Sequence, residues 1–175
     1  TLAGTATQIN SLVLDSSTEA LAVNGPASSL NIKSGAILAT TTTPAHGMSL
    51  GGFTGLTTDA GNDYIVYVTN PTSTFTLNTP LTTAAPLVKA GAGTLVLGAA
   101  NSTTDVYFNQ GLIQTDAFNK LGTGDLKFQG GGLRWATGAT FDPSSRVMSF
   151  GTGGGSLDTN GNNVTLANAI GGGGV

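Results

Sequence analysis

Short runs in which apolar and polar residues alternate recur along most of the chain. Leu30-Asn31-Ile32 and Leu126-Lys127-Phe128 are two of them, and the runs are about three to five residues long. Alternation with a period of two puts successive side chains on opposite faces of a β-strand. No window keeps apolar residues at helical spacing over three turns, and 115–121 could form one helical turn at most. The pattern therefore predicts an all-β chain.

The spacing of the runs favours a solenoid. Leu12, Leu21 and Leu30 follow one another at intervals of 9 residues. Turn-forming residues separate the runs, as in Asn24-Gly25-Pro26 and Gly122-Thr123-Gly124, and Gly and Asn adopt the positive φ of sharp corners. Short strands joined by tight corners are typical of stacked coils with two or three strands each. A sandwich of longer antiparallel strands stays open as the alternative.

Residues 40–85 interrupt this rhythm. They contain two longer strand candidates, 64–69 and 73–77, joined by Asn70-Pro71-Thr72. On composition this pair predicts a β-hairpin. We therefore expect a small antiparallel β insertion that projects from one corner of the solenoid, and insertions at such loops frequently carry binding.

The chain is thus expected to have three parts. Coils of the solenoid occupy 1–39, the inserted module occupies 40–85, and further coils occupy 86–175. Thr1 is not a natural start, so we expect the chain to be a piece of a longer protein.

Composition limits the classes of function. Asp, Glu, Lys and Arg make up 9% of the residues, against about 25% in an average soluble domain, so Thr, Ser, Asn and Gly must cover the surface. Six basic residues and a net charge of −3 provide no phosphate-binding cluster, which excludes nucleic acid as a partner. No run approaches the ~18 apolar residues of a membrane span. Such a composition, without cysteine, is typical of extracellular bacterial β-proteins.

The second half of the chain carries a longer pattern. The segment Leu87-Val88-Lys89-Ala90-Gly91-Ala92-Gly93-Thr94-Leu95-Val96-Leu97, followed by Ala99-Ala100-Asn101, resembles the autotransporter-associated β-strand repeat. That repeat has the form Leu-x-Lys-x-Gly-x-Gly-Thr-Leu-x-Leu. Residues 121–133 and 153–161 look like further copies, although the Gly-Gly-Thr corner of the family is lost at 105–113. The resemblance covers 86–175 and extends more loosely over 9–38.

This resemblance implies a right-handed parallel β-helix from the passenger of a type V secretion protein. Such passengers lie outside the bacterial cell and serve as stalks for an adhesive or enzymatic tip. The resemblance implies flanking repeats of the parent chain as partners, and it supplies no catalytic residues. Because the chain begins and ends within repeats, we also expect end-to-end self-association, with carbohydrate or a host or cell surface as further candidate partners.

Candidate chemistry is sparse. His46 has Ser49 and Asp59 nearby in the sequence but no nucleophile motif. A zinc site takes several His or Cys ligands, and the chain has one His and no Cys, so we expect none. The acid pairs Asp15 with Glu19 and Asp59 with Asp63 could each share a corner, but neither can be assigned as a glycosidase pair. We expect no catalytic residue, metal or cofactor.

Ligand-binding candidates are aromatic or polar residues that could present a surface to a sugar. They are Trp135, Arg134, His46, Tyr64 and Tyr67. The alternative function is a carbohydrate-active β-helix enzyme, a lyase or a tailspike-like glycosidase. The observation that separates the two is whether two carboxylates and a basic residue converge in one groove.

Overall fold

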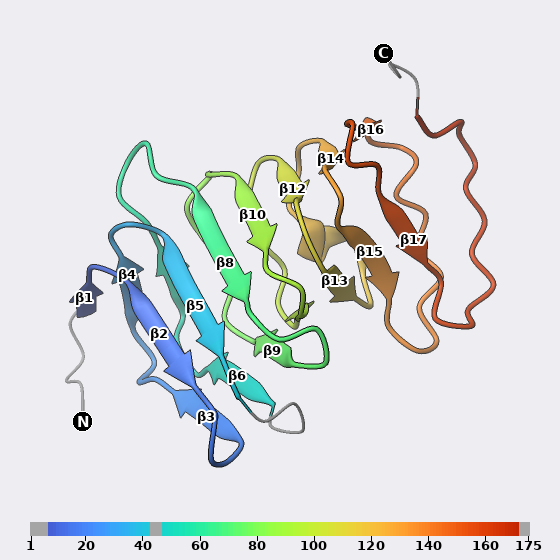
Figure 1. Ribbon diagram of the computed structural model, residues 1–175. Helices are drawn as coiled ribbons and strands as arrows, with labels where there is room; N and C mark the ends of the chain where they lie inside the picture. Colours follow the sequence, from blue (N-terminus) through green and yellow to red (C-terminus); the bar gives the residue numbers. More distant parts are fainter. Residues whose placement is uncertain (1–6, 43–46, 172–175) are drawn as a thin grey trace.

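The chain folds into a parallel β-solenoid of about six turns. The computed structural model describes residues 7–42 and 47–171. Successive turns climb along one axis, with the N-terminal strands at one end and β16 and β17 at the other (Figure 1). Every strand pair in the described residues is parallel, which confirms the all-β solenoid and excludes the sandwich.

Three parallel sheets form the walls of the solenoid. Sheet A contains β1 (Thr7–Ile9), β4 (Ser29–Ile32) and β7 (Gly55–Thr57). Sheet B contains β2 (Leu12–Asp15), β5 (Ala36–Thr40), β8 (Tyr64–Val68), β10 (Leu87–Ala90), β12 (Val106–Phe108), β14 (Leu126–Phe128) and β16 (Met148–Phe150). Sheet C contains β3 (Leu21–Asn24), β6 (Met48–Gly51), β9 (Thr74–Leu77), β11 (Thr94–Leu97), β13 (Leu112–Thr115), β15 (Gly132–Trp135) and β17 (Ser156–Asp158).

Sheet A ends at β7, and beyond it an asparagine side chain supplements the scattered backbone hydrogen bonds between turns on that side. Asn101 accepts a hydrogen bond from the Leu81 amide at 2.8 Å and donates one to the Lys120 carbonyl at 2.6 Å. Lys120 belongs to η1 (Phe118–Leu121), a single 3₁₀ turn that lies within the segment expected to hold one helical turn at most. The amide thus connects three successive turns where no strand ladder does so.

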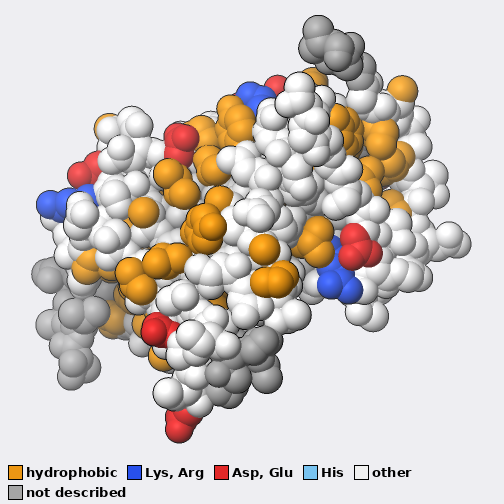
Figure 2. Space-filling model, viewed as in Figure 1, with side chains coloured by type: hydrophobic (Ala, Val, Ile, Leu, Met, Phe, Trp, Pro, Cys, Tyr) orange, Lys and Arg blue, Asp and Glu red, His pale blue; other side chains and the backbone are white. Residues whose placement is uncertain are grey.

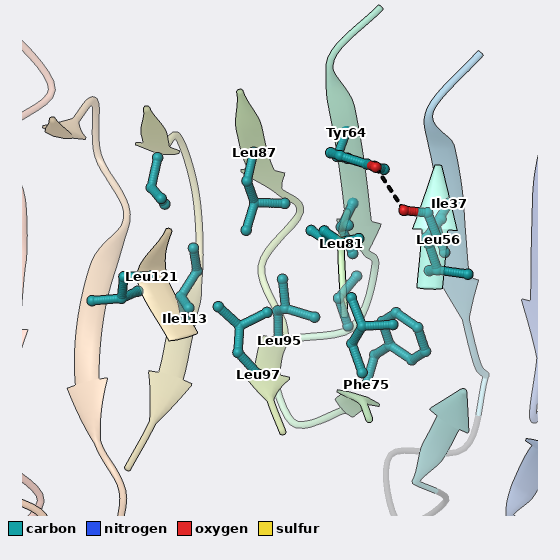
Figure 3. Packing of buried hydrophobic residues seen from close by; sticks show 14 of the residues in the cluster. Ile37, Leu56, Tyr64, Phe75, Leu81, Leu87, Leu95, Leu97, Ile113 and Leu121 are labelled. Atoms are coloured by element: carbon teal, nitrogen blue, oxygen red, sulfur yellow. Dashed lines mark hydrogen bonds between the residues drawn. The ribbon is translucent and has the colours of Figure 1, made fainter. Parts of the chain in front are cut away.

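Inward side chains stack on the equivalent residues of the next turn. The strand register aligns Ile37 with Val66 and Phe108 with Phe128, and all four are at most 1% exposed. Figure 3 shows this packing of buried side chains from successive turns. Since these inward side chains, most of them apolar, stack on one another from turn to turn, the core is continuous along the axis.

Three phenylalanine rings stack on one another along sheet B. The centroids of Phe108 and Phe128 lie 4.4 Å apart with an interplanar angle of 7°, and those of Phe128 and Phe150 lie 4.7 Å apart at 12°. The spacing approaches the ~4.8 Å between hydrogen-bonded strands. Parallel in-register pairing therefore places identical side chains directly over one another.

Glycine is required where the chain turns from sheet B to sheet C. Gly91 has φ 74° and Gly111 has φ 67°, in the left-handed region that glycine adopts without strain. A Cβ atom on Gly91 would lie 2.3 Å from the Val68 carbonyl oxygen, and one on Gly111 would lie 2.3 Å from the Gly93 carbonyl oxygen. The corners of neighbouring turns are thus in direct backbone contact.

The predicted antiparallel insertion over 40–85 is wrong. Tyr64–Val68 and Thr74–Leu77 do not pair with each other: β8 lies in sheet B between β5 and β10, and β9 lies in sheet C between β6 and β11. Asn70-Pro71-Thr72 therefore turns a corner of the solenoid instead of reversing the chain. The strands described within 40–85 belong to the same three sheets as the rest of the described chain.

The lost rhythm in this segment comes from longer turns. Thr40 and Thr69 follow the aligned residues Ala39 and Val68 in successive turns and are 29 residues apart. Asp105 and Asp125 are also equivalent positions, and they are 20 residues apart. The additional residues lie in the connections, so the strands keep their register.

Candidate functional site

The structure brings two acidic and two basic side chains together at one corner of sheet B. Asp105 precedes β12 and Asp125 precedes β14, so the pairing of Val106 with Leu126 puts them side by side. Lys127 Nζ lies 2.6 Å from Asp105 Oδ2. Arg146, just before β16, is close enough to interact electrostatically with both acids. We call Asp105, Asp125, Lys127 and Arg146 the charged corner.

Both oxygens of the Asp105 carboxylate have a donor. Besides the bond from Lys127, Oδ1 accepts a hydrogen bond from the Asp125 amide at 2.9 Å. These two hydrogen bonds hold the pKa of Asp105 below its ordinary value, and the bond from Lys127 has the larger effect. The pKa of Lys127 is raised, mainly by its hydrogen bond to Asp105 and secondly by the hydrogen bond that it donates to the Tyr107 hydroxyl at 3.2 Å. The pair is therefore ionised at neutral pH.

Arg146 is tied to the backbone of the preceding turn. Its Nη1 donates to the carbonyls of Leu121 and Gly122 at 3.1 and 3.2 Å, and its guanidinium carbon lies 5.2 Å from the centre of the Phe118 ring. Burial lowers the pKa of Arg146, while Asp125 and Asp105 oppose that shift. The guanidinium thus joins turns as a structural cation.

The charged corner does not have the properties of a glycosidase acid pair. A general acid at neutral pH needs a carboxyl with a raised pKa, and that of Asp105 is lowered. The cavity of about 320 Å³ beside Arg146 is lined also by Ser144, Ser145 and Met148, and by neither carboxylate. Both acids thus belong to an ion-paired corner and line none of the cavities described for this part of the chain, whereas Arg146 lines this one.

Two of the aromatic ligand candidates lie in the interior. Trp135 is 1% exposed and donates its indole N–H to the Phe141 carbonyl at 2.9 Å. Tyr64 is fully buried, and its hydroxyl donates to the Leu56 carbonyl at 2.8 Å, the contact drawn in Figure 3. Neither ring presents a face to a sugar.

The remaining candidates are dispersed. Arg134 on β15 pairs with Asp158 on the next turn at 3.3 Å and donates to Asn160 at 2.8 Å. Tyr67 is 44% exposed on the outer face of sheet B. His46 lies outside the described residues.

The acid pairs proposed from the sequence have different surroundings. Asp59 and Asp63 line one cavity of about 400 Å³ with Asn62, Thr83 and other residues, none of them basic. Asp59 accepts a hydrogen bond from the Asn31 side chain at 2.9 Å. Asp15 instead accepts one from the amide of Ser17, so it is held within its own corner.

One buried charge escaped the sequence analysis. Lys89 on β10 is fully buried, and its Nζ donates to the carbonyls of Ala90, Gly91 and Gln110 at 2.7, 2.7 and 3.1 Å. Burial lowers the pKa of Lys89 to about 7. The signal was present, because Lys89 alternates in phase with the buried Leu87. The amine joins the corner of its own turn to the corner of the next.

Residues 7–42 and 47–171 contain no group of three or more His, Cys, Asp or Glu side chains placed to hold a metal ion. Within the same residues no helix has both the length and the apolar character needed to span a bilayer.

Comparison of the chain with protein-family models, curated proteins and solved structures gave no match. The resemblance of 86–175 to the autotransporter repeat therefore rests on its motif alone. At the level that the structure shows, the chain is a parallel β-solenoid.

Proposed function

We propose that this chain is a non-catalytic structural segment of a secreted or cell-surface bacterial fibre or adhesin, comparable to the stalk of an autotransporter passenger. The observation that carries the proposal is the unbroken stack of inward side chains through all the described turns. Polar groups that could do chemistry, such as Lys89, Asp105 and Arg146, are engaged in holding one turn to the next.

A solenoid suits a spacer because its length depends on the number of turns. Each added turn extends the axis by ~4.8 Å, the distance between hydrogen-bonded strands. Each turn contacts its immediate neighbours, so turns can be added without changing the rest. The repeat-like motif of 86–175 and the charge-poor surface support an extracellular stalk, with flanking repeats of the same parent chain as its partners.

Removal of one complete turn tests the spacer role. Deleting residues 87–105 joins Pro86 to Val106, which takes the register position of Leu87. The chain has no cysteine, so Ser11→Cys and Val147→Cys, at exposed positions near the two ends of sheet B, can carry two spin labels specifically. We expect a folded protein whose label-to-label distance, measured by double electron–electron resonance, is shorter by ~5 Å.

The undeleted chain with the same two labels is the control, and circular dichroism checks the fold of both. A deletion that unfolds the protein, or that leaves the distance unchanged, would show that a turn is not an interchangeable spacer unit.

A carbohydrate-active enzyme is the second candidate. Its only support is that the charged corner brings two carboxylates and two basic groups together, and the lowered pKa of Asp105 counts against a general acid there. The chain and an Asp105→Asn/Asp125→Asn variant would be incubated with neutral and acidic polysaccharides, and new reducing ends and unsaturated products measured. We expect no release above background from either protein. Release by the natural chain that the double variant lacks would establish the enzyme and remove the structural proposal.

A further inference from the structure

Apolar side chains occupy outward positions of sheet B on five consecutive strands, bordered by Asp15 on the first strand and by Lys127, whose amine lies over the Tyr107 ring, beyond the last. These positions include six neighbouring side chains that we call the apolar face: Val13, Leu38, Ile65, Tyr67, Val88 and Tyr107. The register aligns Val13 with Leu38 and Tyr67 in one row, and Ile65 with Val88 and Tyr107 in the other. Val13 is 60% exposed, Tyr67 44% and Ile65 43%. Figure 2 shows hydrophobic side chains gathered on this side of the molecule.

Strand formation alone does not require apolar residues at these positions. On sheet C the equivalent outward row contains Ser49, Thr76, Gln114 and Arg134, with Val96 between them. These polar residues form equally continuous strands in the same turns. The apolar character of sheet B is therefore a property of that face, and exposed apolar patches of this kind mark interaction sites.

Charge is absent from the centre of this surface. The outward positions of β5, β8 and β10 carry no acidic or basic side chain, and Lys89 between them points inward. A strongly charged partner would find nothing to pair with there. The complement of the apolar face is a surface that is itself flat and uncharged.

We propose that the apolar face is the site where a second copy of this chain packs, sheet against sheet. Its rows repeat at the ~4.8 Å spacing of parallel strands, and a second copy carries the same spacing, so the ridges of one face can fit the grooves of the other. A face-to-face pair with two-fold symmetry is isologous, so one patch supplies both halves. Two sheets packed in this way lie ~10 Å apart with interdigitating side chains.

The size of the face sets the strength of the pair. Five strands spaced by ~4.8 Å with about four residues of ~3.3 Å each give a footprint of roughly 300 Å². Two such faces are well below the ~1,600 Å² of a standard stable interface. The pair is therefore weak and reversible, and it becomes important where many copies are held at high local density. It joins solenoids side by side, and so it differs from stacking of the end turns.

Sedimentation equilibrium over a wide range of protein concentration tests the pairing. The natural chain should rise from monomer toward dimer mass as concentration increases. Ile65→Lys/Tyr67→Lys places two charges on exposed positions of the face and should stay monomeric. Ser49→Lys/Thr76→Lys makes the same change on sheet C and should associate like the natural chain.

Circular dichroism confirms that the variants are folded, and Val13→Lys, at the most exposed position of the face, provides an independent variant. A natural chain that remains monomeric at every concentration would overturn the proposal. A folded face variant that associates as strongly as the natural chain would also overturn it, because association would then occur through the end turns. Neither result would affect the spacer function, which the turn deletion tests separately.

Discussion

Lys89 occupies a position of the interior that neighbouring turns give to apolar side chains. The register aligns it with Val66 before it and with Phe108 after it. Its aliphatic stem can pack in this row while its amine reaches the corner, where three backbone carbonyls lie within 3.1 Å. Those carbonyls favour the ammonium, whereas burial favours the neutral amine. A lysine is tolerated at this inward position because its side chain is long enough for the amine to reach polar groups beyond the apolar row.

The pH dependence of stability reports on this buried amine. The pKa of Lys89 is lowered to about 7 in the folded chain, against 10.5 for a free lysine. Between these values the unfolded chain binds more protons, so the free energy of unfolding rises as the pH increases from about 7 toward 10.5. Urea denaturation at a series of pH values should show this rise, and Lys89→Met should abolish it.

The exposed Lys33 provides the control for that experiment. Lys33→Met removes the same charge from the surface and should keep the rise. If the free energy of unfolding rose equally with pH in Lys89→Met and in the natural chain, the Lys89 amine would have to keep its ordinary pKa in the folded state.

At the scale of strands, the sequence predicts local structure better than pairing. Alternation in Leu126-Lys127-Phe128 defines a strand and its inward face without reference to the rest of the chain, and β14 lies there. Asn70-Pro71-Thr72, by contrast, is compatible with a hairpin or with a corner, and only the neighbouring turns decide between them. The Asp105–Lys127 contact also joins residues 22 apart, so it depends on the length of the turn.

Truncating the stacked phenylalanines measures how much side-chain contacts between neighbouring strands of sheet B contribute to the free energy of unfolding. Phe128 lies between Phe108 and Phe150 and is fully buried. Phe128→Ala leaves a cavity with rings on both sides, so the free energy of unfolding should fall by about 3–5 kcal/mol. Phe150→Ala, on a partly exposed ring with one stacking partner, should cost clearly less. Urea denaturation monitored by circular dichroism measures both values, and equal losses would contradict the role assigned to the stack.

The whole molecule is a row of turns, and each turn pairs with the one before and the one after. β10, for example, pairs with β8 and β12, whereas β2 and β16 lie at the two edges of sheet B. The spacing of short strands and sharp corners predicted such a molecule. In it, backbone pairing between successive turns satisfies most of the backbone polar groups. Which turns are longest could not be predicted, since connections change length without disturbing the register.

Stability should therefore vary along the axis. In a linear array the turns with two neighbours are held more strongly than those with one. Amide hydrogen exchange should be slowest in β8, β10 and β12 and faster in β2 and β16. Phe128→Ala should accelerate exchange in β12, β14 and β16 first, and leave β2 and β5 nearly unchanged, because its effect reaches distant turns only through each intervening interface. Equal acceleration in all strands would mean that the turns unfold as one cooperative unit, and a spacer built from separable turns would then have no energetic basis.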